Sequence, residues 1–357
     1  MKELLLYHII SLGIGILLDQ VIGDPYFLPH PIRAIGSLIS YLERRLLGSQ
    51  TAESETDQEN KPLESGLDRD VKKEKRKGIL LWIIVELVVI SVTFLIIFVS
   101  YRVNKYLGIG VEAILTCYIL AARSLCRESM AVSRELEKKD IRAARKALSM
   151  IVGRDTAELE EEEIAKAAVE TVAENTSDGV IAPLFYTAIG GPVLGFAYKA
   201  INTMDSMLGY RNERYENFGW LSAKADDVLN FIPSRLSAIF MILSAFVMGL
   251  FSKVYSGAGA YRIWKRDRLK HLSPNSAQTE SVCAGALGIR LGGAHLYGGV
   301  MVEKPSIGDE LRKTETADIK RANNLMFATE AVAAMIIFVI LAVIFYIIPS
   351  IGSNLTQ

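Results

Sequence analysis

Three carboxylates follow one another at four-residue intervals, Glu170, Glu174 and Asp178, directly before the apolar stretch at 180–201. In a helix, residues four apart lie on one face, so Glu170 and Glu174 would point the same way. The Asn-Thr-Ser-Asp-Gly run at 175–179 favours a helix end instead, with Asp178 in a turn beside the pair. Carboxylates grouped against an apolar segment suit general-base or metal-ligand chemistry, so these three are the catalytic candidates.

A second polar group lies between two later apolar runs and carries charges of both signs. Asp226 and Asp227 offer the oxygen ligands that Mg²⁺ uses when it carries phosphates. Arg211, Arg214 and Lys224 offer cations for phosphate or carboxylate, the arginines as bidentate forks. A solvated salt-bridge network between helices is the alternative interpretation. The position beside membrane segments favours a site, with the two aspartates as metal ligands.

Two further groups give weaker signals. Asp19, Asp24 and His30 gather at the end of the first apolar run and are secondary candidates for a site. The glycines from Gly285 to Gly293 would let backbone N–H groups approach an anion. The run lacks Gly-Lys-Ser/Thr, so it is not a Walker loop, and packing of small residues between helices is an equal alternative.

The elements that must position these residues are those of a membrane protein. Apolar residues make up 50% of the chain, and the mean hydropathy is +0.26. Lys and Arg together number 40, as do Asp and Glu, so no net charge recruits nucleic acid, and none is expected as a partner. Cys117, Cys126 and Cys283 are too few and too scattered for a disulfide framework or a Cys-x-x-Cys metal site.

Several apolar runs have the length of a membrane-spanning helix, which needs about 20 mostly apolar residues. Those that qualify are 4–22, 79–99, 231–251 and 326–348. The run at 109–122 is short, and the run at 180–201 is interrupted by prolines and glycines. Such a broken segment either bends back or forms an ordinary kinked span. The expected fold class is therefore all-α, a polytopic helical membrane protein with a broken or re-entrant segment.

Basic residues in short loops indicate which side of the membrane a segment occupies. They crowd at 72–77, 123–154 and 253–290, so the main polar loops are expected on the cytoplasmic side of a multi-pass protein in the cell membrane. An even number of crossings must then separate the last two segments. Either both 180–201 and 231–251 cross, or neither does.

The whole chain, 1–357, is expected to form one membrane-embedded domain. Residues 50–77 form a charged insert with few large apolar side chains, which predicts disorder. Residues 123–179 have the pattern of a mainly soluble helical segment, and 253–325 that of a soluble loop segment.

The order of the motifs resembles that of the integral-membrane adenosylcobinamide-phosphate synthases of cobalamin biosynthesis. Single pieces are weak signals, but their order and spacing over nearly the whole chain are specific. The matching segments are Gly23-Asp24-Pro25 with His30-Pro31, Gly153-Arg154-Asp155, Ala173-Glu174-Asn175 with Asp178-Gly179, Asn202 to Asp205, Asp226-Asp227 with Asn230, Ser273-Pro274-Asn275, and Gly285 to Gly293. Together they support Arg154, Asn175, Ser273 and Asn275 as substrate- or phosphate-binding candidates and Asp205 as a secondary one.

The resemblance implies ATP-dependent amide bond formation between adenosylcobyric acid and 1-amino-2-propanol or its O-phosphate, giving adenosylcobinamide or its phosphate. A carboxylate accepts an amine only after its oxygen has become a leaving group, so an acyl phosphate made from ATP is the expected intermediate. Mg²⁺ is inferred as the metal. The expected partners are the corrinoid and aminopropanol substrates and membrane lipid, with association with other membrane-bound corrinoid enzymes as a further expectation.

Two other functions use similar features. A membrane transporter also has Gly/Pro-broken segments and intramembrane charges, although this chain shows no internal repeat and its polar groups concentrate in loops. A membrane phosphotransferase acting on lipid-linked nucleotides also places acidic pairs at the bilayer edge. Its Asp-Gly…Ala-Arg…Gly…Asp spacing is not evident around Asp226 and Asp227.

Overall fold

The computed structural model describes residues 2–23, 30–48, 70–210, 212–297 and 299–353. Its elements in chain order are α1 (Lys2–Val21), α2 (Pro31–Leu47), α3 (Val71–Val103), α4 (Lys105–Ile119), α5 (Ala122–Glu137), α6 (Ile141–Ser149), α7 (Glu161–Asn175), η2 (Thr176–Ile181), α8 (Ala182–Leu208), α9 (Trp220–Leu229), α10 (Phe231–Phe251), α11 (Gly257–Asp267), α12 (Ser276–Leu287), β1 (His295–Tyr297), β2 (Val300–Val302) and α13 (Ala317–Ser353).

Six helical stretches are long and apolar enough to cross a membrane, and each overlaps an apolar run seen in the sequence. They are Lys2–Val21, Val71–Val103, Lys105–Glu137, Glu161–Leu208, Phe231–Phe251 and Ala317–Ile347. The predicted all-α, polytopic membrane class is confirmed. Within the described part of the chain, the one sheet is the short antiparallel pair of β1 and β2.

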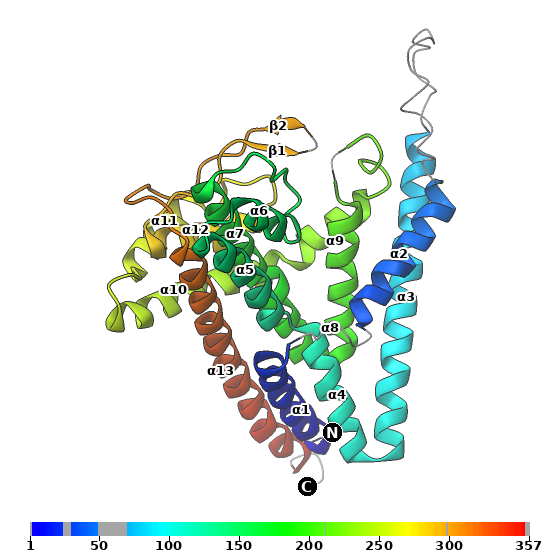
Figure 1. Cartoon of the computed structure of the whole chain (residues 1–357). Helices are drawn as coiled ribbons and strands as arrows, with labels where there is room; N and C mark the ends of the chain where they lie inside the picture. The colour runs from blue at the N-terminus through cyan, green and yellow to red at the C-terminus, as the bar shows by residue number, and fades with distance from the viewer. Residues whose placement is uncertain (1, 24–29, 49–69, 211, 298, 354–357) are drawn as a thin grey trace.

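The long apolar helices run lengthwise, and the polar elements gather at one end of the molecule. Figure 1 shows α1, α3, α4 and α13 running along its length, whereas α10 runs across it beside α11 and α12. The three basic segments at 72–77, 123–154 and 253–290 all reach the end where α6, α11 and the β-strands lie.

The helical stretch Glu161–Leu208 has 48 residues and folds back on itself. As one straight helix it would be about 72 Å long, more than twice the hydrocarbon thickness. The rings of Tyr186 and Tyr198 instead stack with centroids 5.1 Å apart, where a continuous helix would separate the two residues by about 18 Å. We call α7, η2 and α8 the central hairpin. Of the two forms that the sequence left open, the structure has the re-entrant one.

The reversal lies at Gly190 and Gly191, whose backbone angles are not helical. Gly191 has φ +61° and ψ −162°, a region essentially restricted to glycine. Pro192 then begins the second arm, where a missing N–H is tolerated. The two arms approach so closely at Gly195 that a Cβ there would lie 2.3 Å from Oγ1 of Thr187. Glycine is therefore required for the turn and for the packing of the arms.

A polar cluster supports the tip of the central hairpin. Nδ1 of His8 lies 2.6 Å from Oε1 of Glu112, and the Tyr101 hydroxyl donates to the other oxygen of that carboxylate. Nε2 of His8 lies 3.2 Å from the carbonyl oxygen of Ala188, which has no helical donor because residue 192 is proline. A carbonyl group without a hydrogen-bond donor is costly within a membrane, so this cluster stabilises the interruption of the helix at the hairpin tip.

The helix predicted to end at 175–179 continues, so that prediction is wrong. Thr176–Ile181 forms a π-helix that joins α7 directly to α8. The side chains that indicated a turn donate back along the helix instead, from Asn175 to the carbonyl of Thr171 and from Thr176 to that of Val172. A π-turn holds more residues than an α-turn and often marks a functional site. Asp178 lies in this π-turn rather than in a loop.

The charged insert predicted at 50–77 differs from the structure at its C-terminal end. Residues 49–69 lie outside the described residues, but α3 begins at Val71, so 71–77 are helical. Oδ1 of Asp70 accepts the N–H of Lys73 at 3.0 Å and caps this helix. The charged residues 71–77 are helical because they extend a long apolar helix that is already formed, so no new helix has to be nucleated.

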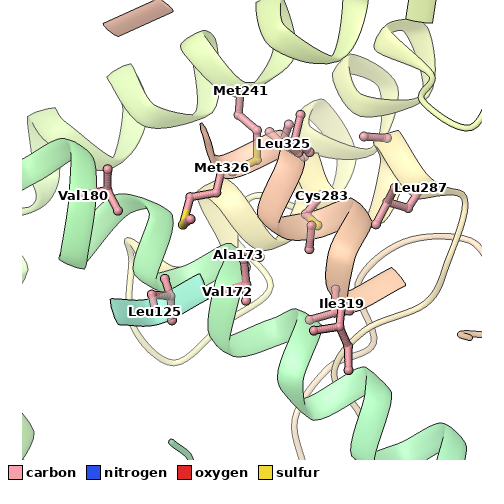
Figure 2. Close-up of a cluster of buried hydrophobic side chains, with 14 of the residues drawn as sticks. Leu125, Val172, Ala173, Val180, Met241, Cys283, Leu287, Ile319, Leu325 and Met326 are labelled. Carbon is pink, nitrogen blue, oxygen red and sulfur yellow. The ribbon is translucent and has the colours of Figure 1, made fainter. Parts of the chain in front are cut away.

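Two hydrophobic clusters flank the central hairpin. Its first arm contributes Val172 and Val180 to the cluster of Figure 2, where they meet side chains of α5, α10, α12 and α13 such as Leu325. The second arm contributes Phe196 and Ile201 to another cluster with α2, α3 and α4. The arms therefore belong to different hydrophobic clusters.

Candidate functional site

A cavity of about 780 Å³ lies between the central hairpin, α9 and the loop before α12. Five carboxylates line it, from α7, η2, α8 and α9: Glu174, Asp178, Asp205, Asp226 and Asp227. We call this space the acidic cavity. The structure thus brings together two catalytic candidates, one secondary candidate and both metal candidates of the sequence analysis.

Hydrogen bonds fix the orientation of the Asp226 carboxylate. Asn202 donates to its Oδ1 at 3.2 Å and Asn230 to its Oδ2 at 3.0 Å. Asn230 is fully buried, and its own Oδ1 accepts the hydroxyl of Tyr198 at 2.8 Å. The Tyr186 hydroxyl donates to the carbonyl of Leu229 at 2.9 Å. The stacked tyrosines of the central hairpin therefore hold the end of α9, and with it Asp226.

The electrostatics of the acidic cavity favour a bound cation. Burial raises the pKa of Asp226 to about 6, against the hydrogen bonds of Asn202 and Asn230, which lower it. The negative charges of Asp227 and Glu174 raise this pKa further. A cation between these carboxylates would remove that repulsion.

The loop before α12 meets Asp227 through its polar residues. Nδ2 of Asn275 donates to the backbone carbonyl of Asp227 at 2.9 Å, and Oγ of Ser273 lies 3.5 Å from its Oδ1. Oδ1 of Asn275 accepts from Ser234 and Arg235 at the start of α10. Ser273 lines the acidic cavity, whereas Asn275 is buried beneath it as a support.

A smaller cavity of about 130 Å³ adjoins the acidic cavity. We call it the side cavity. The two share Gly153, Glu174, His271 and Lys304 in their linings. Glu174 stands between them, and its Oε1 accepts the hydroxyl of Ser276 at 2.8 Å.

A buried ion pair occupies the side cavity. Arg154 pairs with Glu170, and the exposed fractions of the two side chains are 9% and 6%. The other oxygen of Glu170 accepts the N–H of Gly292 at 2.6 Å. Arg154 and Asn175 line this cavity. The glycine-rich run therefore donates an N–H to a carboxylate of the protein itself, and Glu170 serves to hold that loop.

Three lining residues were not among the site residues chosen from the sequence. His271 and Lys304 line both cavities, and Glu280 lines the side cavity. His271 directly precedes the Ser-Pro-Asn motif, which was a usable signal, whereas nothing local marks Lys304 or Glu280. Lys304 is the one Lys or Arg among the lining residues of the acidic cavity within the described chain.

The protonation of two of these groups follows from burial. Burial lowers the pKa of His271, against the neighbouring charge of Glu174, so its neutral form is favoured. Nδ1 of this ring lies 3.1 Å from the N–H of Ser273 and accepts it, which leaves the proton on Nε2. Burial also raises the pKa of Glu280 well above its usual range.

Two predicted phosphate-binding residues, Arg214 and Lys224, do not line the acidic cavity. Arg214 pairs with Glu43 at 2.8 Å and lies over the ring of Tyr215, so it joins the loop before α9 to α2. Lys224 is 61% exposed, with Nζ 4.0 Å from Oδ2 of Asp227. Arg211, the third of this set, lies outside the described residues.

The secondary candidates near the first helix are also separate from the acidic cavity. Asp19 is fully buried on α1, and His30 caps α2 by accepting the N–H of Ile32 at 3.2 Å. His30 lines another cavity, between α2 and α5. Asp24 lies outside the described residues.

The residues present fit Mg²⁺ that arrives with phosphates. Among the described residues, no three His, Cys, Asp or Glu side chains converge to hold a metal ion alone. Mg²⁺ commonly takes one or two carboxylates together with substrate phosphates and water. The adjacent and mutually repelling Asp226 and Asp227 supply such a pair. The acidic cavity can therefore hold a cation with a polyphosphate and accept a proton at another carboxylate.

Comparison with known proteins assigns the chain to a family. The sequence matches the family described as CobD/Cbib protein over residues 12–326. A cobalamin biosynthesis protein CobD from Pelobacter propionicus is 47% identical over 325 residues, which cover 91% of this chain and 93% of the relative. The CobD protein of Clostridium perfringens is 45% identical over 340 residues, covering 94% and 99%. The cobalamin biosynthesis protein CbiB of Salmonella arizonae is 42% identical over 328 residues, covering 91% and 95%. No solved structure matches the chain significantly.

Proposed function

Because the chain belongs to the CobD/CbiB family and so has a role in cobalamin biosynthesis, we propose that it is an ATP-dependent amide ligase. It joins the free propionate carboxyl of adenosylcobyric acid to the amine of 1-amino-2-propanol or its O-phosphate. The product is adenosylcobinamide or its phosphate. The reaction takes place in the acidic cavity, at the polar end of a multi-pass protein of the cell membrane.

One observation carries this proposal. Asp226, Asp227, Glu174 and Asp178 all line the acidic cavity, with Lys304 in the same lining. Amide synthesis from ATP needs these kinds of group. Carboxylates hold the metal that accompanies the phosphates, a lysine faces phosphate charge, and another carboxylate takes the proton of the amine.

The chemistry runs in two steps. The substrate carboxylate attacks the γ-phosphorus of ATP, an acyl phosphate forms, and ADP leaves. The amine then attacks the acyl carbon, the carbon–oxygen bond to phosphate breaks, and inorganic phosphate leaves. The amine must lose protons, so a carboxylate within hydrogen-bond reach of the nitrogen is needed as the base.

The surroundings of each acidic residue indicate which of them would hold the metal and which would act as the base. Glu170 accepts from Arg154 and Gly292, so it positions a loop rather than reacting. Glu174 and Asp178 line the acidic cavity and are the base candidates. Asp226 and Asp227 would hold Mg²⁺, which when bound supplies positive charge to the transferred phosphoryl group.

Mass spectrometry of the corrinoid product tests the proposal. Protein purified in detergent is incubated with adenosylcobyric acid, ATP and Mg²⁺, with aminopropanol and its phosphate in parallel reactions. A mass gain equal to condensation with one amine is expected and identifies the acceptor. Asp226→Asn should remove this gain, whereas Arg44→Gln, an exposed change on α2, should leave it intact. A folded protein that gives no gain with either amine refutes the ligase.

A transporter is the second candidate, because the central hairpin is a broken helix with His8 and Glu112 at its tip. Substrate-dependent ATP consumption in detergent, where no two compartments exist, favours the ligase. Accumulation of a corrinoid in sealed vesicles without any change of its mass favours the transporter. Dependence on a CDP-linked donor would instead point to a phosphotransferase.

A further inference from the structure

The side cavity contains a buried carboxyl group that the proposed reaction does not use. Glu280 lies on α12, lines this cavity and is 6% exposed. Among the described residues, no side chain or backbone group forms a hydrogen bond or ion pair with its carboxyl group. Burying a polar group without a partner is costly, so its place in the wall of a cavity points to a ligand.

The charges around Glu280 favour a cation as that ligand. The negative charges of Glu174 and Glu170 add to burial in raising the pKa of Glu280. Lys304 and Arg154 act in the opposite direction, but the pKa stays well above its usual range. The positive side chains already present therefore do not compensate these carboxyl groups, whereas a bound cation would.

The acceptors in this lining match a primary ammonium group, which has three N–H donors. Oε1 of Glu174 accepts the hydroxyl of Ser276 at 2.8 Å, and Glu280 follows Ser276 by one turn on α12. Figure 1 shows α7 and α12 next to each other. Nδ2 of Asn175 donates to the carbonyl of Thr171 at 3.0 Å, which leaves Oδ1 of Asn175 as an acceptor. Glu174, Asn175 and Glu280 all line the side cavity.

The volume of the side cavity, about 130 Å³, restricts the ligand to a small molecule. By comparison, a cavity of about 150 Å³ holds one benzene molecule. A short amino alcohol therefore fits, whereas ATP and a corrinoid are far too large. Ile151, Pro305 and Ile307 also line the cavity, and they suit the carbon chain of such a molecule.

We propose that the side cavity binds the primary ammonium group of the amine substrate, which donates to Glu174, Glu280 and Asn175. The identity of this amine, 1-amino-2-propanol or its O-phosphate, rests on the proposed ligase activity. The two acceptors carry the same amine, so the site serves either of them.

This site distinguishes the two base candidates. Glu174 lines both cavities, whereas Asp178 lines the acidic cavity and not the side cavity. Glu174 takes one proton from the ammonium nitrogen, and the freed electron pair attacks the acyl carbon. The carbon–oxygen bond to phosphate then breaks, and the second proton of the nitrogen leaves with the phosphate.

Calorimetric titration of the protein in detergent tests the site without turnover. 1-Amino-2-propanol, propane-1,2-diol and MgCl₂ are titrated separately, without corrinoid, in the presence and absence of a non-hydrolysable ATP analogue. The amine should bind at least tenfold more tightly than the diol, which has the same shape but no charge. Equal binding of the diol, displacement of the amine by Mg²⁺ alone, or no binding of the amine under either condition overturns the proposal.

Glu280→Gln tests the site within the reaction. The change should raise the Kd and the KM for the amine about tenfold or more, because the ammonium group loses a charged acceptor, and it should leave the KM for ATP unchanged. Glu86→Gln is the matched control, since Glu86 is also 6% exposed but lies on α3 and lines neither the side cavity nor the acidic cavity. It should change neither KM.

The amine site and the ligase activity fail separately in these experiments. Amide formation with an unchanged KM for the amine in Glu280→Gln would refute the amine site and keep the ligase. Amine binding that is lost in Glu280→Gln, from a protein that gives no corrinoid mass gain, would refute the ligase and keep the amine site.

Discussion

Replacing Asp226 by asparagine should stabilise the protein while it removes the activity. The carboxylate is buried beside Asp227 and Glu174, so its ionised form is costly in the folded state without a cation. Asparagine has nearly the same shape and carries no charge. The protein therefore accepts a destabilising charge at the position where we place the metal.

The expected gain in the free energy of unfolding follows from the pKa of Asp226. The pKa rises from 3.8 to about 6, and two units correspond to about 3 kcal/mol of lost stability once the group is ionised. Against this, Asn202 and Asn230 both donate to the carboxylate, and an amide accepts at only one atom. Losing one such bond costs about 1–2 kcal/mol. The net gain of Asp226→Asn should be about 1–2 kcal/mol.

The dependence on pH has a definite sign. Because the pKa of Asp226 is higher in the folded protein than in the unfolded chain, the folded state binds the proton more tightly. The penalty is absent below about pH 4, grows up to about pH 6 and is constant above that. The free energy of unfolding of Asp226→Asn should therefore be higher than that of the parent protein at pH 7–8. At pH 4 the two proteins should be about equally stable.

Chemical unfolding in detergent without divalent cations measures the difference. Asp227→Asn is the matched control, since the side chain of Asp227 is 29% exposed and the same change there should have a smaller effect. Added Mg²⁺ should stabilise the parent protein more than Asp226→Asn. An Asp226→Asn protein that is less stable than the parent at pH 8 without metal would refute this reasoning.

Three further changes test other parts of the structure by unfolding and steady-state kinetics. Gly191→Ala should lower the free energy of unfolding by about 1–3 kcal/mol because of the backbone angles at this position. Gly110→Ala is the control and should have little effect, because a Cβ there meets nothing within 4 Å. Equal effects of the two changes would contradict the strained turn. Arg154→Met should lower the free energy of unfolding by about 3–5 kcal/mol, because Glu170 stays charged and buried. Adding Glu170→Gln to this variant should restore part of the lost stability, and no restoration would contradict the ion pair. Lys304→Met should raise the KM for ATP about tenfold or more with little change in Tm, and an unchanged KM would exclude a phosphate contact.

Membrane segments could be predicted from the sequence because their signal is local. A run of about 20 apolar residues suffices to identify a span, and all six stretches of the structure overlap a run seen in the sequence. The family resemblance was likewise carried by the order of short motifs, and it is confirmed. Acidic residues next to apolar runs pointed to Glu174, Asp178 and Asp226, which do meet in one cavity.

Two of the errors concern contacts between distant parts of the chain, and a third is local. Arg214 had the charge for a phosphate site, but its partner is Glu43 on α2, 171 positions away. Lys304 belongs to the acidic cavity although no motif surrounds it. The turn-forming residues at 175–179 stay helical, because Asn175 and Thr176 bond back along their own helix.

The sequence by itself determined the membrane class, the apolar helices and the interruption of the run at 180–201 by prolines and glycines, since each depends on neighbouring residues alone. Only the tertiary structure decided that the chain reverses there, with Tyr186 stacked on Tyr198. It also decided which charges share a cavity and how far burial shifts the pKa of Asp226. Burial and charge interaction depend on distances between elements, and those distances arise only when the helices pack.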